Sequence, residues 1–548
     1  MLKCILLLAI LFLCYGNNQL IAQPNYDLYA VLLKDKKGTS FSVFQPQAYL
    51  SAAALERRAI QGISINEQDL PIPPAYLIAI ANQGVEITQS SKWLNLVLIY
   101  TTDKEQLATI ANLPFVENIL PVGQHRAIRP YKQYTKRLEV DSSQFVANYY
   151  GHAAFQIEQM QGDFLHQLGY RGQEIEVAIA DGGFSNAYRT GVFDSVYQSN
   201  RLWGTKDFVD GDDWVYQNST HGTGVWSTMA ANTPQMMVGT APASNYYLLR
   251  TEDTQNELPV EEIHWVIAME YADSVGVDVV NSSLGYSVYR DKSKSYTYAD
   301  MNGKNTWISQ GAAIATQKGM LLVNAAGNDG KKEWKYLFAP SDVTDVLTVG
   351  AVDSGQQKAD FSGWGPTADG RLKPDVVALG VSTVLTSIVT YGVAYGDGTS
   401  YASPVLCGLV ASLKSAFPLH HHAAIRQAIK ESGHLHSQPN TGIGYGVPNF
   451  EKAYFILQKS ILAVQESGNK IVPFFDKQFT ILLQQQKVND IDIQIKNPFG
   501  KVVFSQQTIG KQLPMQKINL SLEHLPKGCY ILQLNLDNKI QYFQLFKN

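Results

Sequence analysis

Four polar residues stand where strand-like or helix-like stretches of the sequence begin or end. Asp181 follows the apolar run IEVAIA and precedes two glycines, and Asn328 ends the run MLLVNAAGN. His221 and Ser400 begin two stretches that are typical of buried helices, HGTGVWSTMA and SYASPVLCGLV. Because α/β folds build their sites at the carboxyl ends of strands and at nearby helix starts, these four residues are candidates for one common site.

The types of these side chains suit acyl transfer. A serine hydroxyl at a helix N-terminus is well placed for a nucleophile, an imidazole can take its proton, and a carboxylate can orient the imidazole. A side-chain amide can donate a hydrogen bond to negative charge that develops on a carbonyl oxygen. We therefore predict that Asp181, His221 and Ser400 form a catalytic triad and that Asn328 serves an oxyanion hole.

Each residue taken alone also has an ordinary structural explanation. Asp181 and Asn328 could lie in turns, His221 could cap a helix or lie at the surface, and Ser400 could be an N-cap. The catalytic interpretation is favoured because all four fall in one α/β segment, and the triad residues follow one of the orders known for serine peptidases. An esterase of the α/β-hydrolase type would need the order Ser, Asp, His instead.

A proline, Pro404, lies in the predicted helix that begins at Ser400. We expect it in the first turn, where the N–H that proline lacks would have no intrahelical partner.

The segment from about residue 149 to 458 must hold these residues in place. Its apolar strand-like runs alternate with helical stretches, a pattern typical of a doubly wound parallel sheet with helices on both faces. The predicted strands precede Asp181 and lie at 245–250, 277–285, 320–328 and 345–352, and the predicted helices lie at 261–274, at 309–318 and after Ser400.

The flanking segments differ in character from this domain. Residues 1–22 are typical of a signal peptide, and residues 23–122 mix strand-like and helical runs, which indicates a small α+β domain. Residues 123–148 are polar and basic, so we expect an exposed linker that is open to proteolysis. Residues 459–548 are short alternating runs separated by turn residues, which predicts a small antiparallel β-sandwich.

Bulk composition excludes some classes of partner. The chain has 548 residues, too many for one hydrophobic core, and its net charge of -4 gives no basic footprint for nucleic acid. After the signal peptide no apolar run approaches the length of about 20 residues that a membrane span needs. Cys407 and Cys529 remain once the signal is removed; we expect no disulfide framework, and Cys407 is predicted to be a small buried hydrophobe.

The segment from about residue 159 to 454 resembles the subtilisin-like serine peptidases. The resemblance lies in VAIADGG, HGTGV, AAGN and GTSYASP around the four candidate residues, and in NSSLGY at 281–286. It implies hydrolysis of polypeptide substrates, with Ser283, Leu284 and Gly285 binding an extended substrate. Three positions depart from the family pattern: Gly182, Tyr401 and Trp226. If Tyr401 and Trp226 crowd the cleft, the alternative is a catalytically silent exported surface or binding protein on the same fold.

The flanking domains resemble companions of that family. Residues 23–122 are similar to a propeptide, which implies an intramolecular inhibitor and a zymogen, and the C-terminal residues are similar to a sorting domain of type IX secretion. This implies a protein exported through both membranes by its signal peptide and the secretion machinery, either secreted or at the cell surface. We expect a monomer without a cofactor. Structural calcium is the open alternative, at acidic positions that could equally be solvated: Asp210, Asp212, Asp213, Glu252 and Asp253.

Overall fold

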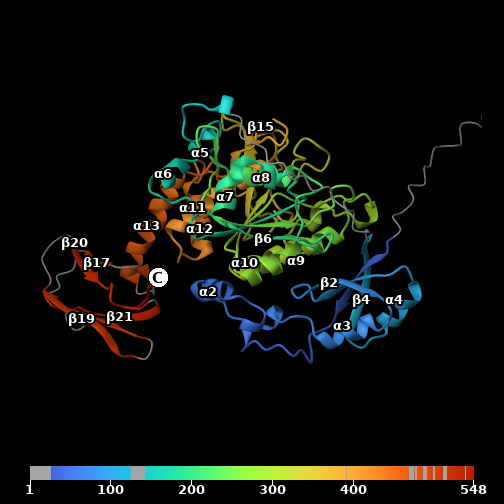
Figure 1. Cartoon of the computed structure of the whole chain (residues 1–548), viewed down its shortest axis with the longest axis horizontal. Coiled ribbons are helices and arrows are strands. Elements are labelled where there is room, and N and C mark those ends of the chain that lie inside the picture. The colour runs from blue at the N-terminus through green and yellow to red at the C-terminus, as the bar shows by residue number, and fades with distance from the viewer. Residues whose placement is uncertain are drawn as a thin grey trace, which may run out of the picture.

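A computed structural model describes residues 26–124, 142–390 and 392–467, and all of 474–547 except 476–477, 485–489, 498–499, 510–514, 527 and 537–538. Figure 1 shows three regions that follow one another along the chain, blue, green to orange, and red. The predicted signal peptide and residues 125–141 of the predicted linker lie outside the described residues. The predicted domain bounds remain predictions.

A seven-stranded parallel sheet forms the centre of the largest region, as predicted. Its order is β13-β12-β11-β10-β5-β9-β6, so the chain crosses β5 when it passes from β9 to β10. The strand order therefore reverses beside β5, which is where α/β sheets place their sites. The strands are β5 (Glu176–Asp181), β6 (Leu202–Asp207), β9 (Asn245–Arg250), β10 (Val279–Ser282), β11 (Leu321–Ala325), β12 (Leu347–Val352) and β13 (Val376–Leu379).

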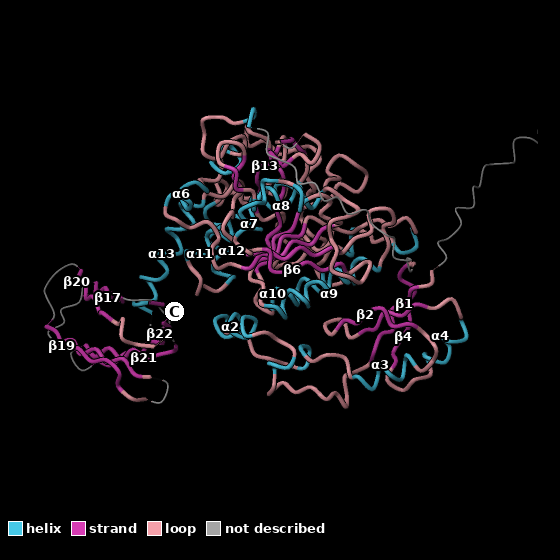
Figure 2. The backbone as a smooth tube through the Cα atoms, in the orientation of Figure 1, coloured by secondary structure: helices cyan, strands magenta, loops and turns pink. Residues whose placement is uncertain are grey.

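Helices cover both faces of this sheet (Figure 2). Alternate side chains of β5 face opposite ways: Val177 and Ile179 join one buried cluster, and Ala178 and Ala180 join the other. Both faces are therefore apolar, which explains the uninterrupted hydrophobic runs in the sequence. The first cluster contains residues of α6 (Gly162–Gln167), α7 (Asp194–Gln198), α8 (His221–Ala230), α11 (Thr399–Ala416), α12 (His422–Ser432) and α13 (Phe450–Ser467); the second contains residues of α9 (Val260–Val275) and α10 (Trp307–Gln317).

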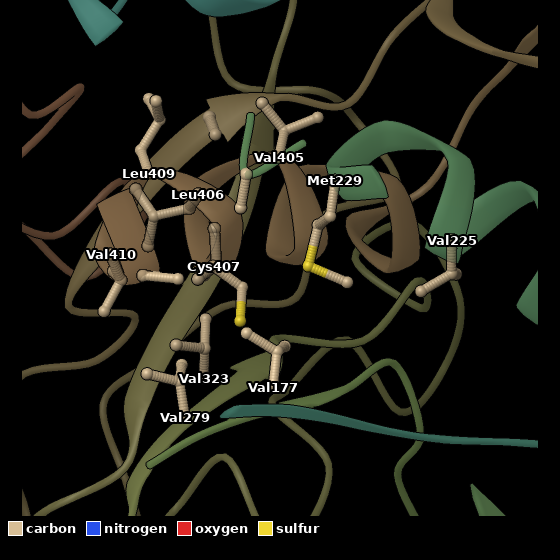
Figure 3. Close-up of a cluster of buried hydrophobic side chains, with 14 of the residues drawn as sticks. Val177, Val225, Met229, Val279, Val323, Val405, Leu406, Cys407, Leu409 and Val410 are labelled. Carbon is tan, nitrogen blue, oxygen red and sulfur yellow. The ribbon is translucent and has the colours of Figure 1, made fainter. Parts of the chain in front are cut away.

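Helix α11 lies almost wholly in the core. Figure 3 shows Cys407 of this helix beside Val177, Val279 and Val323 of the sheet. Its side chain is fully buried, and this burial raises the pKa of the thiol, so the prediction of a small buried hydrophobe is confirmed.

The expected place of Pro404 in α11 is wrong. The helix begins at Thr399, so Pro404 lies inside the helix rather than in its first turn. The missing N–H therefore removes a hydrogen bond that a regular helix would make.

Residues 26–124 contain an antiparallel sheet with two buried faces. Ala30 and Leu98 face α9, where they pack in one cluster with Val260 and Ile263. The alternate side chains, such as Val31 of β1, pack in a separate cluster with residues of α3 and α4. The sheet order is β2-β3-β1-β4, and the elements are β1 (Leu28–Leu33), α3 (Pro74–Ala81), β2 (Glu86–Ser91), β3 (Leu96–Tyr100), α4 (Lys104–Ala111) and β4 (Val116–Gly123).

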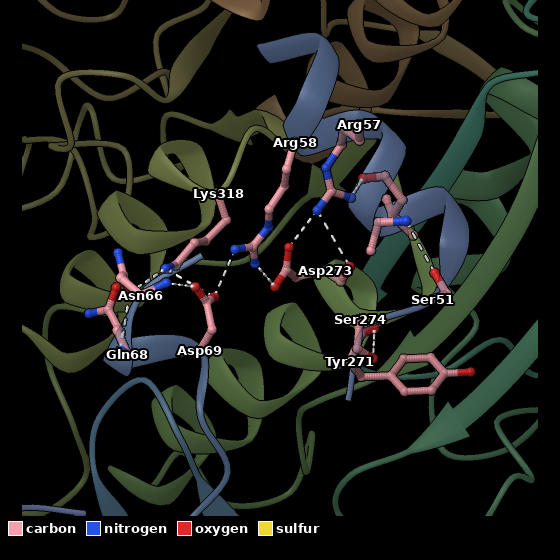
Figure 4. A network of polar contacts seen from close by, with 12 residues as sticks. Ser51, Arg57, Arg58, Asn66, Gln68, Asp69, Tyr271, Asp273, Ser274 and Lys318 are labelled. Atoms are coloured by element: carbon pink, nitrogen blue, oxygen red, sulfur yellow. Dashed lines mark hydrogen bonds and ion pairs between the residues drawn. The ribbon is translucent and has the colours of Figure 1, made fainter. Parts of the chain in front are cut away.

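A second contact between the first two regions is ionic. Helix α2 (Ala52–Gln61) brings Arg57 and Arg58 to Asp273 near the end of α9 (Figure 4). Arg58 also pairs with Asp69 at 2.8 Å, and Lys318 pairs with Asp69 at 3.0 Å. All five side chains are at most 3% exposed. We call these five residues the arginine cluster.

The C-terminal region is rich in strands, as predicted. Ile491, Ile493 and Ile495 alternate along β18 and share a buried cluster with Leu520 of β20, so the two sheets of this region share one core. Most strand pairs are antiparallel, but β16 pairs with β22 in parallel. The sheet orders are β16-β22-β21-β18-β19 and β17-β20, with β16 (Phe474–Phe475), β17 (Gln478–Gln484), β18 (Asp490–Lys496), β19 (Val502–Ile509), β20 (Met515–Ser521), β21 (Gly528–Leu536) and β22 (Lys539–Lys547). Within the described residues, no helix has the length and apolar character needed to cross a membrane.

The arginine cluster predicts the effect of Asp273→Asn. The substitution leaves two buried guanidinium groups without their shared carboxylate, and breaking a buried pair in this way costs about 3–5 kcal/mol. We expect faster hydrogen exchange in α2 and at the end of α9, measured by mass spectrometry. The matched control is Glu56→Gln, an exposed carboxylate on the same helix, which should leave exchange unchanged. Equal protection of α2 in Asp273→Asn and in the parent protein would contradict this account.

Candidate active site

The structure brings together every site residue that the sequence predicts. β5 ends at Asp181, and the segments after β10 and β11 carry Ser283 and Asn328. α8 begins at His221, and Ser400 lies in the first turn of α11. These residues line one pocket of about 290 Å³, together with Leu284 and Gly285.

The hydrogen bond between Asp181 and His221 is the best defined contact of the pocket. His221 Nδ1 lies 2.9 and 3.0 Å from the two carboxylate oxygens of Asp181, and the backbone N–H of Gly182 donates to Oδ1 at 2.8 Å. Asp181 is fully buried, whereas the His221 side chain is 33% exposed. Nδ1 therefore carries the proton that Asp181 accepts, and Nε2 is left to exchange a proton with another group.

The electrostatics of the pocket favour the imidazolium. Burial lowers the pKa of His221, but the charge of Asp181, the hydrogen bond with it and the charge of Glu252 outweigh burial, so this pKa lies above its usual value. Burial in turn raises the pKa of Glu252 to about 7, and the nearby charge of Asp181 adds to this effect.

A close approach of two glycines holds α8 against β5. A Cβ on Gly222 would lie 2.5 Å from the carbonyl oxygen of Gly183 and 3.0 Å from Cβ of Asp181. The Gly222 N–H donates to the same Gly183 oxygen at 3.1 Å. Only a residue without a side chain lets His221 come within hydrogen-bonding distance of Asp181 here.

Two hydrogen-bond donors border the space in front of Ser400. The Asn328 Oδ1 accepts from the N–H and the hydroxyl of Thr399, both at 2.9 Å, which turns its Nδ2 the other way. A Cβ on Gly398 would lie 3.7 Å from Asn328 Nδ2 and 3.6 Å from the Ser400 N. Gly398 has φ +154°, a backbone conformation that favours glycine. Because glycine has no Cβ, no side-chain atom of residue 398 contacts the two donors.

The structure contains one of the two hydrogen bonds that a complete triad requires. The Ser400 hydroxyl donates to the Ser283 carbonyl at 3.5 Å, rather than to His221. Contacts between catalytic side chains are commonly loose before substrate binds.

The departure from the family pattern at Gly182 has a structural explanation. The space in front of Gly182 is occupied by the loop after β9, since a Cβ there would lie 2.8 Å from Thr254 and 3.6 Å from Glu252 Oε2. Glu252 is a pocket residue that sequence analysis noted only as a calcium candidate; its place just beyond the carboxyl end of β9 was the signal.

Trp226, which the alternative of a catalytically silent protein places in the cleft, does not line the pocket. Trp226 is fully buried and stacks on Phe193 with ring centroids 3.9 Å apart, because its position on α8 faces the core. Tyr401 is half-buried and lies beside the His221 ring at 5.6 Å, but it does not line the pocket.

The acidic positions considered for calcium have other partners. Asp210 pairs with Arg250 and Asp213 with Lys206. The carboxylates of Asp212 and Asp253 accept from the backbone N–H groups of Trp214 and Gln255, and Glu252 accepts from Tyr286. In the part of the chain that the structure describes, no group of three or more histidine, cysteine or acidic residues is arranged to hold a metal ion. Calcium binding and the expected lack of a cofactor stay predictions.

The arrangement defines a class of protein. A buried carboxylate that orients an imidazole, beside a serine at the start of a buried helix, is the arrangement of the serine hydrolases. The subtilase family model matches residues 172–446, half of the chain. The chain belongs to the subtilase family. The relatives that it matches in this family are serine endopeptidases.

Known relatives agree with this assignment. Subtilisin E of Bacillus subtilis (strain 168) is 29% identical over 312 residues, which cover 56% of this chain and 73% of the relative. Subtilisin of Bacillus pumilus is 31% identical over 281 residues, covering 50% of this chain and 90% of the relative. Subtilisin BL of Lederbergia lenta is 28% identical over 300 residues, covering 54% and 97%.

Family models also match both flanking regions. Residues 28–137 match the peptidase S8 propeptide domain of Bacteroidota, and residues 475–546 match a secretion system C-terminal sorting domain. The protein is therefore a subtilisin-family peptidase with a propeptide and a sorting tail, and the tail indicates export to the cell surface or the medium.

The glycine contact predicts that Gly222→Ala separates His221 from Asp181. The added methyl group overlaps the Gly183 carbonyl oxygen just after β5, and overpacking of this kind costs about 1–3 kcal/mol. We expect a lower thermal unfolding temperature and lower peptidase activity. Gly224→Ala is the control on the same helix, because a Cβ there meets its neighbours at an ordinary 3.5 Å. Equal losses in the two variants would contradict this account.

Proposed function

We propose that the protein hydrolyses peptide bonds through an acyl-enzyme, with Ser400 as nucleophile, His221 as general base and Asp181 as the residue that orients the imidazole. The observation that carries the proposal is the 2.9 Å contact between His221 and buried Asp181 in a pocket that Ser400 also lines.

The proposed reaction uses the groups of the pocket in sequence. His221 Nε2 takes the proton of Ser400 as the hydroxyl oxygen attacks the peptide carbonyl, while Asp181 stabilises the imidazolium. Asn328 Nδ2 and the Ser400 N–H donate to the oxyanion. The imidazolium then protonates the leaving amine, and a water molecule activated by the same imidazole hydrolyses the ester and releases Ser400.

The substrates we propose are polypeptides in extended form. Ser283, Leu284 and Gly285 continue from β10 along one wall of the pocket, and the backbone of such an edge can pair with an extended peptide. Glu252 and Thr254, which also line the pocket, come from the loop between β9 and α9.

We propose that residues 26–124 act as an intramolecular inhibitor, so that the chain is a zymogen. β4 ends at Gly123, where a Cβ would lie 2.8 Å from Val260 at the start of α9. The loop that precedes α9 lines the pocket, so β4 ends against the helix that directly follows this loop. Cleavage of the predicted linker would separate the inhibitor from the peptidase.

The alternative function is a catalytically silent exported surface or binding protein on the same fold. It depended on Trp226 and Tyr401 crowding the cleft, and neither residue lines the pocket.

The triad predicts that Ser400→Ala is inert. We expect kcat to fall by about 10⁶, the magnitude known for subtilisin itself, and the predicted linker to stay uncut. A fluorophosphonate should label the parent protein once its linker has been cut and leave the variant unlabelled, because only an activated serine reacts. Ser412→Ala, in the same helix but outside the pocket, is the control and should be labelled normally. A Ser400→Ala chain that still cuts its own linker would sink the assignment of the nucleophile.

The pKa of His221 predicts how activity depends on pH. The general base must be neutral, so kcat/KM falls as the pH drops through the raised pKa of His221. Glu252→Gln removes a nearby negative charge, which lowers this pKa, so we expect the acid limb of the profile to move to lower pH. An acid limb that stays in place, or moves to higher pH, contradicts the prediction.

A further inference from the structure

We propose that Asn281 and Ser283 are positioning residues that hold the backbone of the Ser400 nucleophile. This inference rests on the proposed function and deepens it. It assigns the Ser283 hydroxyl a role that is separate from the contact that its backbone makes with the substrate.

The need for such residues comes from Pro404. In a regular α-helix the N–H of residue 404 would donate to the carbonyl oxygen of Ser400, and proline has no N–H. Ser400 is only 9% exposed, so bulk water has little access to its carbonyl. A buried carbonyl without a partner is costly.

The Ser283 hydroxyl takes the place of the missing donor. It donates to the Ser400 carbonyl oxygen at 2.8 Å, from a residue 117 positions away in the sequence. Asn281 Nδ2 donates to the Ser283 hydroxyl at 3.1 Å, which leaves the hydroxyl hydrogen free to point at Ser400. The residue after β10 therefore replaces the hydrogen bond that Pro404 cannot make in α11.

A third hydrogen bond connects the network to α11 a second time. The Ser403 hydroxyl donates to Asn281 Oδ1 at 2.9 Å. Asn281 and Ser403 are fully buried, and Ser283 is 7% exposed. We call these three side chains the serine bridge. It joins β10 and the residue after it to the helix at two points that both precede Pro404, so the first turn of α11 cannot shift along the strand without breaking these hydrogen bonds.

The serine bridge fixes the nucleophile relative to the substrate. The segment that contains Ser283 forms a wall of the pocket, and the Ser283 carbonyl lies 3.5 Å from the Ser400 hydroxyl. One residue thus sets both the wall on which a peptide lies and the place of the attacking serine. A misplacement of about 1 Å can cost about 10² in rate, so loss of the bridge should lower kcat more than it changes KM.

The test is a set of variants made as the full chain, each assayed for kcat, KM, rate of fluorophosphonate labelling and thermal unfolding after the predicted linker has been cut. Ser283→Ala removes the donor, and we expect kcat and the labelling rate to fall about tenfold to hundredfold with KM within about twofold. Ser283→Thr keeps a hydroxyl and should retain most of the activity. Pro404→Ala supplies an N–H at the position that a regular helix uses, so the double variant Ser283→Ala/Pro404→Ala should recover kcat.

Ser412→Ala is the matched control for burial and hydrogen bonding. Ser412 also lies buried in α11 and donates to a backbone carbonyl, that of Thr240 at 2.8 Å, far along the helix from Ser400. It should lower the unfolding temperature by an amount similar to Ser283→Ala and leave kcat unchanged, which separates positioning from stability.

The outcomes distinguish this inference from the proposed function. If the parent protein is not labelled by the fluorophosphonate after its linker has been cut, the proposed function fails. If the parent protein is labelled and Ser283→Ala has normal kcat, or if adding Pro404→Ala restores nothing, the positioning role alone is overturned.

Discussion

The hydrogen bond between Asp181 and His221 constrains where the surrounding strands and helices lie. A carboxylate that is fully buried at the end of a central strand is costly unless it is paired, and here its partner must come from a different element. α8 therefore has to begin within a few ångströms of β5, which only glycine at position 222 allows. The reversal of strand order beside β5 then leaves open the space in which the pocket forms.

Helix α9 connects the pocket to the N-terminal region. The loop before the helix contributes Glu252 and Thr254 to the pocket, and its first turns pack against the antiparallel sheet through Val260 and Ile263. Near its other end Asp273 belongs to the arginine cluster. The apolar contact and the ionic contact thus lie on one rigid element, so residues 26–124 are attached at two separated places.

Much of the fold and of the candidate site could be predicted from the sequence, because both depend on patterns that are local. Apolar runs marked five of the seven parallel strands, and polar residues at strand ends and helix starts marked the pocket that Asp181, His221, Asn328 and Ser400 line. The sequence does not give the direction in which a helix faces or the residue at which it begins. Which side of α8 carries Trp226 depends on the rotation of the helix against the sheet, and the place of Pro404 depends on where α11 begins.

The serine bridge could not be predicted, because it needs the distance between Ser283 and the Ser400 carbonyl, which no spacing in the sequence gives. The arginine cluster was missed for the same reason: Arg57 and Asp273 are 216 positions apart, and adjacent arginines on a helix usually lie in solvent. Polar contacts between distant segments were therefore the part that only the folded structure supplies.

The apolar packing on α9 has a consequence for handling of the protein. Side chains of the antiparallel sheet shield Leu258, Val260 and Ile263 from water. A chain without residues 26–124 therefore presents a contiguous apolar surface around the start of this helix. Such a surface favours self-association. A peptidase prepared without its N-terminal region should consequently be harder to keep in solution than one that retains the severed piece.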